Sequence, residues 1–222
     1  HPQKEKVPPS VLLGRPLLRE MLRLEAVRTV FQPIVDLDTR AVFAHEALGR
    51  GTYQQLSTGP NDLFLLARRC GMAHELSNLF RRKAVRDAAT LPYGGVIFCN
   101  VHPGELEDLS EAGVDRLIPP VPPGRRLVLE IHEEVVTEPR ILQLLHEQLR
   151  ARGVGLAYDD FGSGQARLRE LADVPPDFVK LDMQLVRNIH LAPSRQDLVK
   201  AICDAIHRHN VKIIAEGLES RE

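Results

Sequence analysis

Residues 154–164 read VGLAYDDFGSG, a short apolar run that ends in two adjacent aspartates and a glycine-bearing loop. A buried strand seldom ends in charged residues without a role, because an unpaired buried charge is costly. The same pattern recurs along the chain. The polar residues at the downstream ends of apolar runs are Glu46, Asn100, Glu130, Asp159, Asp160, Lys180 and Glu216. Strands that alternate with helices and end in polar groups predict a β/α barrel whose site lies at the C-terminal ends of the strands.

The apolar periodicity predicts the individual elements. Strands are expected at residues 29–35, 41–48, 95–101, 126–131, 153–159, 178–181 and 211–215. Helices are expected at residues 12–24, 61–69, 74–90, near 104–109, and at 139–150, 165–171 and 197–209. Turn chemistry at 36–40 predicts a hairpin, so the first two strands should be antiparallel. Arg81, Arg82 and Lys83 are expected on a solvated helix face.

The predicted fold class is α/β, a TIM-like β/α barrel with an antiparallel first strand, truncated before the eighth strand. Residues 1–10 are polar and contain prolines, which is typical of a linker or an expression remnant. Residues 11–222 are then one domain whose C-terminal end is missing.

Composition excludes several classes of protein. The 222 residues are 43% hydrophobic and 27% charged with a net charge of −1, so a general nucleic-acid or membrane surface is not expected. The three cysteines form no CxxC pair, which favours a reducing, cytoplasmic setting. No apolar run approaches the roughly 18 residues that span a bilayer, although the parent protein could be membrane-anchored.

Six oxygen-donor side chains and one lysine at strand ends are typical of a site for hard metal ions and phosphate. Mg²⁺ or Mn²⁺ prefers such donors, and two ions can share them. The alternative interpretation is a ring of salt bridges that closes the mouth of the barrel.

Several motifs together resemble the EAL-domain family in order and spacing, from about Leu12 to the chain end. They are FQPI at 31–34, EAL at 46–48, LEI at 129–131, DDFGSG at 159–164, KLD at 180–182 and AEGLE at 215–219. That family consists of bacterial cyclic di-GMP phosphodiesterases and their inactive relatives. The resemblance implies hydrolysis of cyclic di-GMP to linear pGpG with two Mg²⁺ or Mn²⁺ ions per site, and inhibition by Ca²⁺.

The resemblance also implies residue roles. Metal ligands would be Glu46, Asn100, Glu130, Asp159, Asp160, Asp182 and Glu216, and catalysis would fall to Glu46, Asp160, Lys180 and Glu216. Gln32, Arg50 and Glu219 would bind the substrate. Glu133 would anchor the loop at 160–164, which mediates dimer contacts in the family. Gln32 and Arg50 could equally be ordinary surface residues, and Glu133 a solvated charge.

Some positions depart from the family pattern. Gly49 stands where leucine is usual, which could loosen the backbone near Arg50. His102 and His132 stand where a small hydroxyl residue is usual, and strand alternation is expected to turn both toward the mouth of the barrel. Each could bond a ligand carboxylate, join the metal site or be packed and neutral. Alternation likewise predicts that Asp182 faces the same side as Lys180.

The main expectation is a metal-dependent cyclic di-GMP phosphodiesterase. The alternative is a catalytically inactive EAL-type receptor or signalling scaffold, and a weaker one is an unrelated metal-dependent β/α-barrel hydrolase. Expected partners are cyclic di-GMP, a second copy of the chain in a homodimer, and an upstream sensory or diguanylate-cyclase domain.

Overall fold

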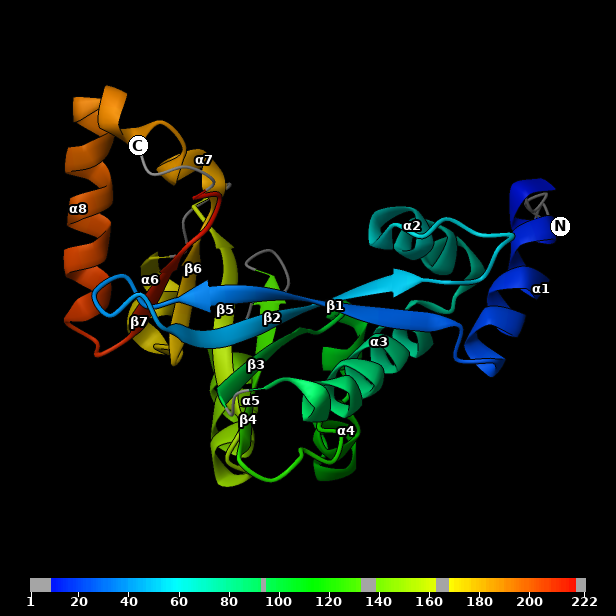
Figure 1. Ribbon diagram of the computed structural model, residues 1–222. Helices are drawn as coiled ribbons and strands as arrows, with labels where there is room; N and C mark the ends of the chain where they lie inside the picture. Colours follow the sequence, from blue (N-terminus) through cyan, green and yellow to red (C-terminus); the bar gives the residue numbers. More distant parts are fainter. Residues whose placement is uncertain (1–8, 93–94, 133–138, 163–167, 219–222) are drawn as a thin grey trace, which may run out of the picture. The chain divides into compact units, whose positions relative to one another are not determined.

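The computed structural model describes residues 9–92, 95–132, 139–162 and 168–218 (Figure 1). The chain divides into two compact units. Unit 1 contains His1–Glu105 and Pro119–Arg125, and unit 2 contains Leu106–Ile118 and Arg126–Glu222. Within the described residues, no helix is both long and apolar enough to cross a lipid bilayer.

Unit 1 is built on a long antiparallel ribbon of β1 (Val27–Val35) and β2 (Val42–Gly51), visible in Figure 1. The connecting turn is held by Asp36, whose carboxylate accepts hydrogen bonds of 2.8 Å from both the backbone N–H and the hydroxyl of Thr39. Strand β3 (Gly95–Asn100) then pairs with β2 in parallel. The predicted hairpin and its antiparallel pairing are confirmed.

The helices of unit 1 are α1 (Pro9–Arg23), α2 (Pro60–Cys70) and α3 (Ala73–Asp87), followed by a 3₁₀ turn at Ala88–Thr90. Leu18 and Met21 of α1 are fully buried, and they share a core with Leu63 of α2 and Leu76 of α3. Helix α1 begins at Pro9, so the last two residues of the predicted linker belong to this helix.

Unit 2 contains four parallel strands, each paired with the next along the chain. They are β4 (Arg125–His132), β5 (Gly155–Phe161), β6 (Phe178–Leu181) and β7 (Lys212–Ala215). The helices that accompany them are α4 (Glu111–Leu117), α5 (Pro139–Ala151), α6 (Leu168–Asp173), α7 (Met183–Val186) and α8 (Pro193–His207). Two 3₁₀ turns complete the described elements: η2 (Pro103–Glu107), whose residues up to Glu105 belong to unit 1, and η4 (Ile189–Leu191) in unit 2.

The predicted fold class is confirmed. Seven strands follow one another in the described residues: β1 is antiparallel to β2, β2 and β3 are parallel, and β4 to β7 are parallel to one another. The short helices α4 and α7 were not expected, because four to seven residues are too few for an apolar period to be read. Side-chain capping explains both: the Ser110 hydroxyl accepts from Gly113 N–H, and the Asp182 carboxylate accepts from Gln184 N–H.

Candidate active site

In unit 2, a cluster of charged side chains is centred on the ammonium group of Lys180, which lies on β6. Its Nζ lies 2.8 Å from Glu130 Oε1, 2.9 Å from Asp159 Oδ1 and 2.8 Å from Glu216 Oε1. These carboxylates come from β4, from β5 and from the residue after β7. An ammonium has three donors, and each can therefore meet one carboxylate. The Lys180 side chain is 2% exposed and Glu130 is fully buried, so the pairs are shielded from water.

An irregularity in β5 places two successive aspartates at this site. Tyr158 is paired with Val179 and Phe161 with Leu181, so Asp159 and Asp160 lie opposite the single residue Lys180. Asp160 has a φ of 55°, a left-handed conformation that aspartate tolerates better than most residues. Regular alternation would turn the two side chains to opposite faces of the sheet. The extra residue is therefore what lets both carboxylates serve one site.

Asp160 lies beside His132, the last residue of β4, with 2.8 Å between His132 Nε2 and Asp160 Oδ2. Of the alternatives left open for His132, contact with a carboxylate is the one found. Burial and then the negative charge of Asp159 raise the pKa of Asp160, and Asp182 adds to the effect. The interactions with His132 and Lys180 oppose this rise in pKa without cancelling it.

Asp182 is close enough to act on Asp160 electrostatically, but the reason predicted for its orientation is wrong. Strand β6 ends at Leu181, so alternation does not extend to Asp182. Its carboxylate instead accepts a 2.7 Å hydrogen bond from Gln184 N–H and caps α7. Asp182 is therefore a buried residue whose carboxylate is oriented by the helix cap.

The donor set of unit 2 suits a hard divalent cation. Asp159, Asp160 and Glu216 each offer an oxygen, and these oxygens all lie within 4.8 Å of one another. One ammonium among this many carboxylates leaves negative charge in excess, which a divalent cation would neutralise. The residues present therefore fit the metal that the sequence predicts.

The predicted site residues of unit 1 lie along the β1–β2 ribbon and at the end of β3. Gln32 on β1 is directly opposite Glu46 on β2, and Arg50 lies four residues beyond Glu46 on the same strand. Asn100 is the last residue of β3 and is exposed. That Glu46 and Asn100 share metal ions with the unit 2 carboxylates stays a prediction.

The structure explains why glycine stands at position 49. A Cβ at Gly49 would collide with the ring of Phe80 on α3, so the phenyl ring occupies the room that a larger residue would need. The neighbouring Arg50 guanidinium donates a 2.9 Å hydrogen bond to the carbonyl of Gly49.

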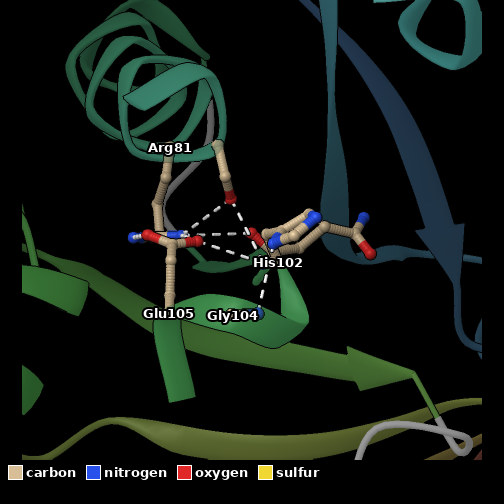
Figure 2. A network of polar contacts seen from close by, with 6 residues as sticks. Arg81, His102, Gly104 and Glu105 are labelled. Atoms are coloured by element: carbon tan, nitrogen blue, oxygen red, sulfur yellow. Dashed lines mark hydrogen bonds and ion pairs between the residues drawn. The ribbon is translucent and has the colours of Figure 1, made fainter. Parts of the chain in front are cut away.

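Two sequence predictions in unit 1 are wrong. Arg81 was expected on a solvated face of α3, yet its side chain is 1% exposed and pairs with Glu105 (Figure 2). The spacing of residues along the helix could have predicted this burial. Arg81 lies four residues from both Ser77 and Val85, which are buried on the same helix face. Alternation also fails for His102, since β3 ends at Asn100 and the His102 ring stacks on Phe64 with centroids 6.0 Å apart.

Two predicted residues, Glu133 and Glu219, lie outside the described residues, as do Ser163 and Gly164 of the loop at 160–164. Their predicted roles therefore remain predictions. Of the cysteines, Cys70 and Cys99 are buried, and Cys203 is partly buried.

The fold and the site define the class of this protein: a β/α-barrel-type domain with a lysine-centred acidic site at the ends of its parallel strands. The family model described as EAL domain matches residues 17–222, and the chain belongs to this family.

Relatives named cyclic di-GMP phosphodiesterases support the same grouping. The chain is 28% identical over 225 residues to the probable cyclic di-GMP phosphodiesterase PdeI of Escherichia coli (strain K12), covering 92% of this chain and 27% of the relative. It is 30% identical over 220 residues to the cyclic di-GMP phosphodiesterase NbdA of Pseudomonas aeruginosa, covering 91% of this chain and 27% of that relative. The chain thus spans little more than a quarter of the length of these two curated relatives.

A solved structure agrees with the fold. Klebsiella pneumoniae BlrP1, in its manganese and cyclic di-GMP complex at pH 9.0, matches with a TM-score of 0.75 and 27% identity. The match covers 88% of this chain and 50% of that chain.

Proposed function

We propose that this domain hydrolyses cyclic di-GMP to linear pGpG with the help of two Mg²⁺ or Mn²⁺ ions. The observation that carries the proposal is the cluster around Lys180. There the carboxylates of Glu130, Asp159 and Glu216 surround the ammonium, and the carboxylate of Asp160 lies beside those of Asp159 and Glu216. Relatives named cyclic di-GMP phosphodiesterases, and a manganese and cyclic di-GMP complex of a similar structure, support the same substrate and cofactor.

Most of the predicted site residues would bind the metal ions, and Lys180 would act on the water and the phosphate. Glu46, Asn100, Glu130, Asp159, Asp160, Asp182 and Glu216 would hold the ions. When bound, two such ions supply an activated water and neutralise charge on the phosphoryl group. Lys180 would orient the attacking water and balance the negative charge that develops on the phosphate. One P–O bond of the ring is broken as the water oxygen bonds to phosphorus, and the water proton passes to the departing ribose oxygen, which becomes a hydroxyl group.

Residues of unit 1 would recognise the nucleotide. The planar guanidinium of Arg50 suits a phosphate, and Gln32 would contact a guanine base. Glu219 would assist in substrate binding, and Glu133 would anchor the loop after Asp160. A homodimer and an upstream sensory or diguanylate-cyclase domain complete the proposal.

The test is hydrolysis by the purified full-length protein that the gene encodes, with Mn²⁺ and cyclic di-GMP, and with linear pGpG quantified by chromatography. We expect product with Mn²⁺ and none with EDTA or Ca²⁺. Glu216→Gln, which keeps the shape of the side chain, should abolish turnover. Nucleotide binding without metal-dependent product would instead identify an inactive receptor, and the absence of both would reject the proposed substrate.

A further inference from the structure

A buried ion pair lies next to the end of β3, and neither of its residues has a part in the proposed catalysis. Arg81 on α3 places Nη2 2.5 Å from Glu105 Oε1, and Nη1 3.2 Å from Glu105 Oε2. The two side chains are 1% and 7% exposed. This two-point contact joins the middle of α3 to the 3₁₀ turn η2, twenty-four residues along the chain (Figure 2).

The pair is also bonded to the backbone that follows β3. Arg81 Nη1 donates to the carbonyl of Asn100 at 3.3 Å. The N–H of His102 donates to Glu105 Oε2 at 3.0 Å and to the Ser77 hydroxyl at 3.2 Å. Figure 2 shows polar contacts of Arg81 and Glu105 converging on the backbone near His102.

Strand β3 ends at Asn100, and its pairing with β2 ends one residue earlier. The parallel register between β2 and β3 runs from Ala44 and Val96 to Ala47 and Cys99. Beyond it, side chains of α3 and η2 bond the backbone at Asn100 and His102. These contacts therefore help to fix the direction in which the Asn100 side chain leaves the backbone.

Stability alone does not account for the choice of an ion pair here. Replacing a buried ion pair by apolar residues of similar volume is often neutral or even stabilising. An apolar pair, however, could not accept from an N–H and donate to a carbonyl two residues away. What the charged pair contributes beyond packing is the fixed placement of two backbone groups.

We propose that Arg81 and Glu105 are positioning residues that orient Asn100 for metal binding. The inference rests on the proposed function, in which the Asn100 amide oxygen is a metal ligand. Partners that orient metal ligands commonly change metal affinity by about 10- to 100-fold when they are removed. The effect is expected on the binding of the ion, and on KM and kcat only as a consequence.

The test is a double-mutant cycle read by Mn²⁺ affinity, measured by calorimetry and by electron paramagnetic resonance of free Mn²⁺. The apolar replacement Arg81→Met/Glu105→Leu should weaken Mn²⁺ binding by about tenfold or more. In an Asn100→Ala background the same replacement should change the affinity by less than about twofold, because the ligand it orients is already gone. Arg82→Met is the matched control, since Arg82 is 47% exposed and pairs only loosely with Glu25, at 3.3 Å.

Each outcome decides the question. Unchanged Mn²⁺ affinity in the apolar variant, or an equal loss with and without Asn100, would overturn the positioning role. If the apolar variant does not fold, Arg81→Lys takes its place, because an ammonium lacks the planar fork and should give a smaller loss that again vanishes without Asn100. Wild-type protein that binds Mn²⁺ but releases no pGpG would defeat the proposed hydrolysis and leave the positioning role standing. Wild-type protein that does not bind Mn²⁺ would defeat both.

Discussion

Replacing Lys180 by methionine is expected to destabilise the metal-free protein by about 3–5 kcal/mol, the usual cost of leaving a buried charge without its partner. Methionine is unbranched like lysine, is one heavy atom shorter and lacks the ammonium, so the loss is mainly electrostatic. The three carboxylates lie 2.8–2.9 Å from Nζ. Glu130 should dominate the loss because its side chain is fully buried, whereas that of Glu216 is 25% exposed and can be hydrated.

A divalent ion should recover more stability in the Lys180→Met variant than in the wild type. The carboxylates of the variant lack the competing ammonium, so the ion meets more uncompensated negative charge. An ion present at a hundredfold excess over its Kd stabilises the folded state by about 2.7 kcal/mol, and tighter binding gives more. The gain in unfolding free energy on adding Mn²⁺ should therefore be larger in the variant.

The measurement is urea unfolding at neutral pH, with EDTA and with Mn²⁺. Lys200→Met is the matched control, because Lys200 is 74% exposed and its pair with Asp204 lies on the surface of α8. This control should stay within about 0.5 kcal/mol of the wild type. The reasoning is refuted if both variants unfold at the same urea concentration in EDTA, or if Mn²⁺ stabilises Lys180→Met no more than the wild type.

Three further predictions concern single positions. Gly49→Leu should destabilise the protein by about 1–3 kcal/mol by overpacking against Phe80. Adding Phe80→Ala should recover part of this loss, as measured by urea unfolding. A leucine that leaves the stability unchanged would contradict the packing argument. Asp160→Asn should raise the Tm of the metal-free protein at pH 7–8, because a raised folded-state pKa means that ionisation opposes folding. That gain should shrink below about pH 4, where the group is protonated in both states, and a lower Tm at neutral pH would count against it. Burial alone would raise the pKa of Glu105, but hydrogen bonds from Arg81 and its charge outweigh burial and lower it. The stability that Glu105 contributes should thus be full above about pH 4.3 and fall as the pH drops through the folded-state pKa. The unfolding free energies of the wild type and of Glu105→Gln should therefore converge at acid pH. A difference that stays constant with pH would contradict this prediction.

The sequence by itself determined the elements and the family. The strands were readable because buried parallel strands are short apolar runs, and β6 was predicted with its observed bounds. The antiparallel start was readable because turn chemistry is local, and the Asp36 turn acts within a few residues. The residues at the strand ends were found for the same reason, since a polar residue closing an apolar run needs no three-dimensional knowledge.

The tertiary structure decided how those residues meet. The three carboxylates around Lys180 are up to 86 residues apart in the sequence, so no local pattern could assign them to one ammonium. The burial of Arg81 depended on Glu105, whose turn covers that face of α3. The left-handed Asp160 arose from the bulge between β5 and β6, which only strand pairing defines. Apolar periodicity reports what a segment buries, whereas charge pairing and strand register depend on which distant segment lies against it.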